Sequence, residues 1–199
     1  MSNRRIRGAG AKRPHRVLIP VAVVVLILFA IGSFFAPQLI EEIECQVFPL
    51  KYTDYVEESS EEFGVDEAVI YAVIKTESGF RPDVTSSAGA RGLMQMIESA
   101  FDWSQQRYGL SSRLSFDEAF DPKTNIKFGT HILKLLFDEF GDKNLVFAAY
   151  HAGRGNVIAW LQNPEYSKDG VLMNIPEDTG HYINKVNHAL SMYQKLYGL

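Results

Sequence analysis

The pattern of apolar and polar positions divides the chain into an apolar run near its N-terminus and a long region of helical periodicity. Residues 17–35 contain no charged side chain. From Tyr52 onward, apolar residues recur every three or four positions, and alternating valine-rich runs that would indicate strands are absent. The pattern therefore predicts an all-α domain over residues 52–199, preceded by one apolar helix.

Local signals set the boundaries of the helices in this domain. Gly64 and Gly141 are expected to end two of them, and Asp121-Pro122 is expected to start another. Residues 162–177 are predicted to form a loop. The expected helices span residues 52–63, 66–78, 92–108, 121–140, 144–152, 156–161 and 179–197.

The helix predicted over residues 66–78 places a carboxyl group at its buried end. Asp66 is expected to cap its N-terminus, because a side-chain carboxylate can accept hydrogen bonds from the free amides of the first turn. One apolar face is predicted from Val69, Ile70, Val73 and Ile74. Glu77 falls on that face, and Gly79 and Pro82 end the helix directly after it.

Burial of Glu77 has a chemical consequence. Loss of water disfavours the ionised form of a carboxyl group, so its pKa should rise. An acid that stays protonated near neutral pH can donate its proton to a leaving oxygen, which is the task of the general acid in glycoside cleavage. A buried glutamate with a purely structural role would produce the same helix pattern, so the helix alone leaves both interpretations open.

The motifs that follow Glu77 resemble a known family. Glu77-Ser78 precedes a loop of small and polar residues and then Gly92-Leu93-Met94-Gln95; further along come Ala149-Tyr150-His151-Ala152-Gly153 and Asp178-Thr179-Gly180-His181-Tyr182. In this order and at this spacing, they resemble the lytic transglycosylase domain of the goose-lysozyme-like superfamily. The resemblance covers about residues 50–199 and implies a lysozyme-like helical fold.

The resemblance also implies an activity. The substrate would be peptidoglycan, cut between N-acetylmuramic acid and N-acetylglucosamine. Glu77 would protonate the glycosidic oxygen and then accept the proton of the muramyl 6-hydroxyl as that oxygen attacks C1, which gives a 1,6-anhydro sugar. Such an intramolecular attack needs no second carboxylate. Asp83, the nearest acid in the loop, is expected to be a solvated or capping residue instead.

The site residues implied by the resemblance comprise one catalytic residue, Glu77, and the substrate-binding residues Ser78, Ser86, Gln95, Tyr150, His151 and Tyr182. Gln95 suits hydrogen bonding to an acetamido group, and the two tyrosines would line the groove around the glutamate. Ser78 could equally cap the helix end. Gly89 and Gly92 are expected to serve the backbone, through close approach or positive φ. Met94 and Trp103 are expected in the core.

Three positions depart from the family pattern. His151 stands where the family usually has Asn, and its ring can both donate and accept a hydrogen bond. Ile97-Glu98 replaces the usual Met-Pro, and Asp178 replaces the usual Glu. Together these departures leave room for altered specificity or reduced activity.

Charge and cysteine content exclude several classes of function. Residues 1–16 hold six Arg and Lys and no acid. The whole chain has a net charge of −4, so the remaining residues together carry a charge of −10. This acidity argues against nucleic acid as a partner. The single cysteine, Cys45, excludes an internal disulfide. No histidines or cysteines have zinc-ligand spacing and no nucleotide-binding motif occurs, so no metal and no cofactor are expected.

The N-terminal segment predicts a membrane anchor. The uncharged run is long enough to cross a bilayer, and the basic residues before it place the N-terminus in the cytoplasm. A cleavable signal peptide is the competing interpretation. The predicted organisation is a basic tail (residues 1–16), a transmembrane helix (17–36), a linker (37–51) and an extracytoplasmic catalytic domain (52–199), held to the cytoplasmic membrane by a single pass.

The expected partners are peptidoglycan glycan strands, the membrane and proteins of an envelope assembly. Two alternative functions stay open from the sequence. One is a lysozyme-like hydrolase that admits water, and the other is a non-catalytic peptidoglycan-binding scaffold of an envelope assembly. An intact Glu77 argues against a scaffold, which would not need the acid.

Overall fold

The computed structural model describes residues 15–199, and for residues 15–22 and 30 it describes the backbone alone. Most of the predicted basic tail, residues 1–14, lies outside the described residues. The chain divides into two compact units between Val47 and Phe48.

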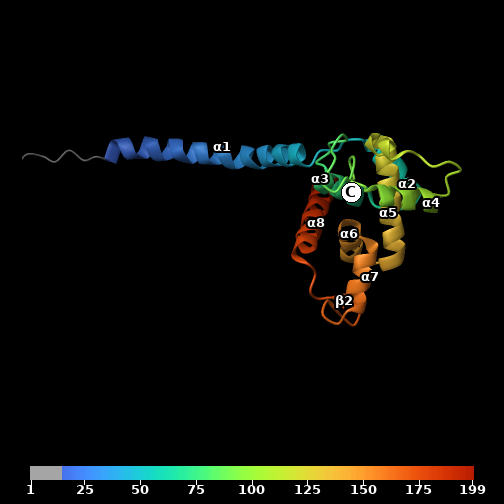
Figure 1. Ribbon diagram of the computed structural model, residues 1–199. Helices are drawn as coiled ribbons and strands as arrows, with labels where there is room; N and C mark the ends of the chain where they lie inside the picture. The colour runs from blue at the N-terminus through green and yellow to red at the C-terminus, as the bar shows by residue number, and fades with distance from the viewer. Residues whose placement is uncertain (1–14) are drawn as a thin grey trace, which may run out of the picture. The chain divides into compact units, whose positions relative to one another are not determined.

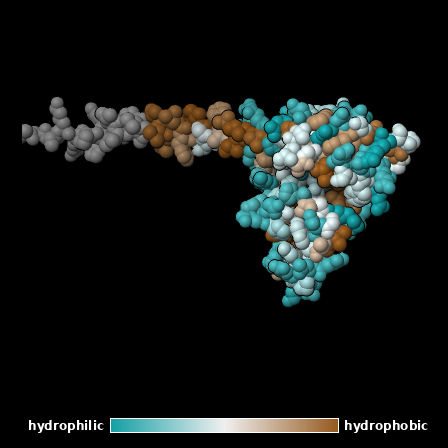
Figure 2. Space-filling view, in the orientation of Figure 1, coloured by the Kyte–Doolittle hydropathy of each residue, from teal (hydrophilic) through white to brown (hydrophobic). Residues whose placement is uncertain are grey.

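The first unit contains helix α1 (His15–Val47). The helix continues past Pro37 to Val47, so much of the predicted linker is helical. Residues Val23–Val47 are long and apolar enough to span a membrane. Their large apolar side chains are exposed, including Leu26, Phe29 and Phe34, and Figure 2 shows this stretch as mainly hydrophobic. A signal sequence would share these properties, so the choice between anchor and signal peptide stays a prediction.

The second unit, Phe48–Leu199, is helical, as the sequence predicts (Figure 1). Its helices are α2 (Thr53–Phe63), α3 (Glu67–Glu77), α4 (Glu98–Tyr108), η1 (Phe116–Phe120), α5 (Pro122–Phe140), α6 (Lys143–Ala152), α7 (Arg154–Gln162) and α8 (Glu177–Tyr197). A two-stranded hairpin, β1 (Ser167–Lys168) and β2 (Val171–Leu172), lies within the predicted loop 162–177. The 3₁₀ helix η1 was not predicted.

Helix α3 is the centre of this unit. It packs on α2 and α8, and every residue from Ala68 to Ile74 is buried. The prediction of a single apolar face is therefore wrong: the middle of α3 is covered on all sides and only its ends carry charges. The predicted side-chain cap is also wrong, because the Asp66 side chain makes no capping hydrogen bond and its backbone carbonyl accepts from the amides of Val69 and Ile70.

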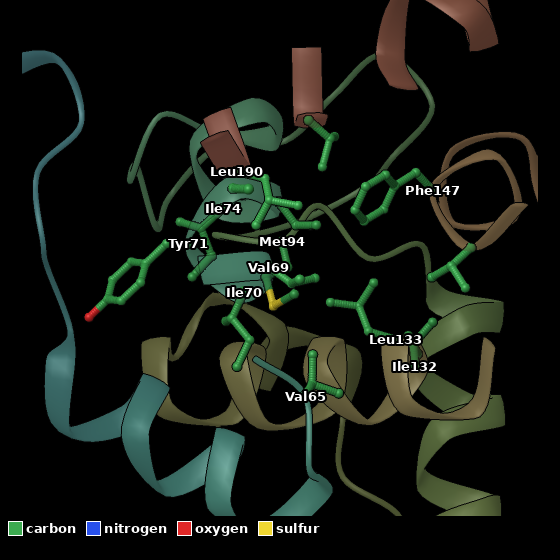
Figure 3. Packing of buried hydrophobic residues seen from close by; sticks show 14 of the residues in the cluster. Val65, Val69, Ile70, Tyr71, Ile74, Met94, Ile132, Leu133, Phe147 and Leu190 are labelled. Carbon is green, nitrogen blue, oxygen red and sulfur yellow. The ribbon is translucent and has the colours of Figure 1, made fainter. Parts of the chain in front are cut away.

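The core joins α3 to the other long helices. Ile70 and Ile74 of α3 pack with Leu133 of α5, Phe147 of α6 and Leu190 of α8 (Figure 3). Helix α5 also packs on α2, α4 and α6, and α6 packs on α8. These contacts fix the C-terminal end of α3 relative to α6 and α8, the two helices that carry the downstream motifs.

The segment between α3 and α4 differs from the prediction. The sequence predicts a helix from residue 92, but the helix begins only at Glu98. Gly92 and Gln95 have positive φ angles of 77° and 49°, and Arg91 forms isolated bridges with Thr85 and Met96. Left-handed residues interrupt an α-helix, so the apolar spacing of Leu93, Met94 and Met96 reflects burial in a folded loop.

Candidate active site

Glu77 is the last residue of α3, and a tight turn follows it. Ser78 is buried, and its hydroxyl donates to the carbonyl of Ile74 over an Oγ–O distance of 3.3 Å. The next two residues, Gly79 and Phe80, have φ angles of 60° and 67°, and the Phe80 ring is buried against Tyr71. A bulky residue tolerates a left-handed conformation only when packing holds it there, so the core fixes this turn and the helix end before it.

The carboxyl group of Glu77 is partly buried and bonded to one side chain. The hydroxyl of Tyr182, on α8, donates to its Oε1 over 2.7 Å. Burial raises the pKa of Glu77 to about 7, although the hydrogen bond from Tyr182 acts in the opposite direction. The rise in pKa that the sequence predicts is therefore confirmed. A carboxyl group with this pKa is protonated in a large fraction of molecules at neutral pH.

Two tyrosines from separate helices surround Glu77. Tyr150, on α6, donates its hydroxyl to the carbonyl of Met94 over 2.8 Å. Burial, and then the negative charge of Glu77, raises the pKa of both Tyr150 and Tyr182 well above the usual value. Both hydroxyls therefore keep their protons and act as donors. The ring of His151 stacks on that of Tyr182 with centroids 4.4 Å apart.

Asn125 of α5 holds the loop that contains Met94. Its Oδ1 accepts from the Met94 amide over 2.8 Å, and its Nδ2 donates to the carbonyls of Arg91 and Ala119. A Cβ atom on Gly92 would lie 2.2 Å from the Ala119 carbonyl oxygen and from Asn125 Nδ2. The predicted need for glycine here is confirmed by both its positive φ and this close approach.

Gln95 and Ser86 reach the same site but are already partly bonded. Gln95 Nε2 donates to the carbonyls of Val84 and Gly92 over 3.0 and 2.9 Å. Both amide N–H groups of Gln95 are thus used within the loop, which leaves Oε1 for a ligand. The hydroxyl oxygen of Ser86 accepts from the amide of Ala90, and its proton can still be donated.

A cavity of about 610 Å³ opens beside Glu77. Among the predicted site residues, it is lined by Glu77, Ser86, Gln95, Tyr150 and His151. Tyr182 reaches it through Glu77. Ser78 does not line it, since its side chain is buried against the helix end, and this favours the capping role over substrate contact. Asp83 is exposed and not on the cavity wall, and Asp178 is exposed and bonded to the neighbouring Thr179 amide.

A second part of the cavity wall was indicated by the sequence only at Ile97, as a departure from the family pattern. It consists of Ile97, which directly precedes α4, Ala100 and Trp103 of α4, and Ile132 and Leu136 of α5. Trp103 is partly buried, and its placement on the cavity wall adds to the predicted core role. Its spacing after Ser99 and Ala100 was the available signal, because these three residues share one face of a helix.

Arg154 lies at the rim of the cavity and is paired with Glu139 of α5. Across residues 15–199, no three His, Cys, Asp or Glu side chains come together in a way that could hold a metal ion.

Comparison with known proteins agrees with this geometry. Residues 54–172 match the family described as the transglycosylase SLT domain. The chain belongs to this family. Over 144 residues it is 33% identical to the soluble lytic murein transglycosylase of Escherichia coli (strain K12), a match that covers 70% of this chain and 22% of that protein. It is 30% identical over 169 residues to the membrane-bound lytic murein transglycosylase C of Serratia proteamaculans (strain 568), covering 73% and 47%.

Solved structures of the SLT family show the same fold. The 70 kDa soluble lytic transglycosylase SLT70 from Escherichia coli superposes with a TM-score of 0.68 and 29% identity, over 76% of this chain and 25% of that chain. An inactive Glu-to-Gln mutant of the lytic transglycosylase Slt from Pseudomonas aeruginosa gives 0.63 and 26%, over 75% and 25%. The predicted lysozyme-like, all-α fold is confirmed. The chain spans between about a quarter and about half of the length of these relatives.

Proposed function

We propose that the chain is a peptidoglycan lytic transglycosylase that cleaves the β-1,4 bond between N-acetylmuramic acid and N-acetylglucosamine. The observation that carries the proposal is that Glu77 is the one carboxyl-bearing residue among the described residues lining the cavity, and that its pKa is raised to about 7. Membership of the SLT family supports the same reaction, since the relatives are named as lytic murein transglycosylases.

The first half of the reaction uses the protonated form of Glu77. Its carboxyl group donates the proton to the glycosidic oxygen, and the bond between that oxygen and C1 breaks as the leaving sugar takes the electron pair. The carboxylate that forms is stabilised by the hydrogen bond from Tyr182, which strengthens when its acceptor becomes charged. Partial burial keeps Glu77 protonated before cleavage. The same surroundings therefore supply a protonated acid at the start of the step and a stabilised carboxylate at its end.

The second half uses Glu77 as a base. Its carboxylate accepts the proton of the muramyl 6-hydroxyl while the hydroxyl oxygen forms a bond to C1. The product is a 1,6-anhydromuramyl end, no water is consumed, and Glu77 is protonated again. A single acid/base is sufficient for this cycle because the nucleophile belongs to the substrate. The remaining Oε1 of Gln95 and the hydroxyl of Ser86 would accept from and donate to the sugars beside Glu77.

The alternative function, a lysozyme-like hydrolase, would require more than the cavity provides. A second carboxylate normally activates water or acts as the nucleophile in glycoside hydrolysis. Asp83, the residue named for this role, is exposed and does not line the cavity. A non-catalytic scaffold has no need for an acid with a raised pKa, and the inactive Glu-to-Gln mutant of the Pseudomonas aeruginosa relative indicates that an acid matters in that family member.

We also propose that α1 anchors the enzyme in the cytoplasmic membrane, with the second unit on the extracytoplasmic side where peptidoglycan lies. The length and hydropathy of Val23–Val47 support a membrane span, and relatives named as membrane-bound transglycosylases support the combination. The basic residues that predict this orientation lie largely outside the described residues. Proteins of an envelope assembly are further candidate partners.

The test is mass spectrometry of purified peptidoglycan digested with the full-length protein in detergent. The wild type should release anhydromuropeptides, and Glu77→Gln should release none. Asp83→Asn is the matched control, since it removes an exposed acid from the same loop and should leave the product unchanged. Products with free reducing ends would indicate a hydrolase, and sedimentation with peptidoglycan without any product would indicate a scaffold.

A further inference from the structure

A second hollow lies beside the cavity that contains Glu77. Its volume is about 550 Å³, and its wall includes Ser99, Asp102, Trp103, Gln106, Leu110 and Arg113. Ser99 and Trp103 also line the cavity of Glu77. The two hollows are therefore neighbours, with the Trp103 side chain at their boundary.

Helix α4 links the two hollows along one face. Ser99, Trp103 and Gln106 are spaced by four and three residues, so they form a stripe on the helix surface. The opposite face of α4 is buried through Phe101 and Ser104, and the buried Gln105 borders the second hollow. From Ser99 to Gln106, the stripe extends about 10 Å along the helix axis. A polymer lying beside Glu77 could continue along this stripe.

The chemistry of the second hollow suits a neutral, partly apolar ligand. Its two charged residues neutralise each other, because the Arg113 guanidinium donates to the Asp102 carboxylate. Trp103 offers an aromatic surface, and the exposed Gln106 and Ser99 offer hydrogen-bonding groups. An N-acetylglucosamine residue carries no charge, has an apolar C–H face that packs on an aromatic ring, and is rimmed by hydroxyl and acetamido groups.

We propose that this hollow is a second glycan-binding subsite, in which a sugar of the same strand stacks on Trp103 while the bond to be cut lies at Glu77. The proposal rests on the proposed function, since it assumes that the cavity of Glu77 takes a glycan. Trp103 would act by holding the strand along α4, so its removal should weaken binding of long glycans in particular. It would take no part in proton transfer.

The tryptophans report whether a sugar contacts Trp103, because the chain contains only two, Trp103 and Trp160. Trp160 lies on α7, stacks on Tyr166 and is not on the wall of either hollow. In full-length Glu77→Gln protein, Trp160→Phe leaves Trp103 as the fluorescent reporter, and Trp103→Phe leaves Trp160. Titration with N-acetylglucosamine oligomers should change the emission of the first variant and leave that of the second unchanged.

The affinity itself gives the second measurement. In the Glu77→Gln background, affinity should increase with oligomer length, and Trp103→Ala should remove this increase, with about tenfold weaker binding of the longest oligomer. Gln106→Ala, an exposed change that spares the fold, should reduce the same increase by a smaller factor. An unchanged length dependence in both variants would refute the subsite while leaving the proposed function intact.

Failure of all oligomers to bind would overturn the proposed function and the subsite together. A loss confined to peptide-bearing peptidoglycan, with no loss for the peptide-free oligomers, would overturn the glycan subsite and assign the hollow to the stem peptide.

Discussion

The two walls of the Glu77 cavity differ in how they are held. On the motif side, polar groups are bonded to fixed partners within the protein: Tyr182 to Glu77, Tyr150 to Met94, and Gln95 to its own loop. On the α4 side, Ile97 is 45% exposed and Trp103 borders two hollows. We therefore expect the motif side to serve proton transfer, and the α4 side to contact the substrate and to determine which substrate fits.

The largest expected effect is on the motif side. Glu77→Gln removes the transferable proton and keeps the shape of the side chain, so turnover should fall by at least about a thousandfold. Anhydromuropeptide release measures it. Trp103→Phe is the comparison from the other wall and should retain most of the turnover. Equal losses in the two variants would contradict the division of roles.

Tyr182→Phe should have the next largest effect. It removes the hydrogen bond that stabilises the Glu77 carboxylate, so turnover should fall by about a hundredfold. The same change removes the influence that lowers the pKa of Glu77, so the fall of activity at high pH should move to still higher pH. Tyr150→Phe is the matched control, because the Tyr150 hydroxyl bonds to Met94 and not to Glu77. This variant should leave the pH at which activity falls unchanged.

Asn125→Ala tests whether the motif side is stabilised by the hydrogen bonds between Asn125 and the loop that contains Met94. Three backbone groups would lose their partner, so the free energy of unfolding should fall by about 3 kcal/mol, measured by denaturant titration. Asn156→Ala removes an exposed side chain that bonds only to the Ala152 carbonyl, and it should cost less than about 1 kcal/mol. Similar losses in both variants would show that the hydrogen bonds of Asn125 contribute no more to stability than the exposed hydrogen bond of Asn156.

The pH dependence of stability tests the burial of Glu77. Its pKa of about 7 lies above the ordinary value of 4.5, so the folded state binds more protons than the unfolded state between these values. The contribution of Glu77 to stability is therefore complete below about pH 4.5 and is lost as the pH rises through about 7. Above pH 7 the loss amounts to about 3 kcal/mol.

Glu77→Gln has no such titration. Its unfolding free energy should therefore exceed that of the wild type increasingly as the pH rises through this range, measured by denaturant titration at several pH values. A constant difference between the two proteins would mean that the carboxyl group is well hydrated.

The smallest effect is expected from Ile97→Ala. The exposed side chain loses contact area with substrate and little packing, so KM should rise by about threefold with kcat nearly unchanged. Steady-state kinetics on soluble glycan would measure both constants. A change in kcat alone would place Ile97 with the motif side.

The sequence predicted the motif side better than the α4 side for a physical reason. Glu77 lies at a helix end whose burial follows from apolar spacing, and its raised pKa follows from that burial. The pairing of Glu77 with Tyr182 spans 105 residues, and no local pattern encodes such a contact. The loop before α4 was predicted as helix because buried loop residues and buried helix residues share the same apolar spacing, and only the φ angles of Gly92 and Gln95 distinguish them.

Trp103 is a second example of what the sequence alone could not predict. A partly buried tryptophan in an amphipathic helix is compatible with core or with groove, and the choice depends on what packs beside it. Here the tertiary arrangement leaves Trp103 partly buried on the cavity wall. Residue type and spacing could therefore predict that Trp103 would be partly buried, but not which side would stay open.

The absence of a side chain at Gly129 couples a remote position to the active site. A Cβ atom there would lie 2.4 Å from the sulfur of Met94, whose carbonyl holds the Tyr150 hydroxyl. The shift that one added methyl group on α5 would force on Met94 would thus be passed, through one side chain and one hydrogen bond, to Tyr150, the neighbour of Glu77. Gly129→Ala should behave as a conditional variant, with turnover that falls more steeply on warming than that of the wild type. Position 129 would then allow the activity to be adjusted without altering any group that meets the glycan.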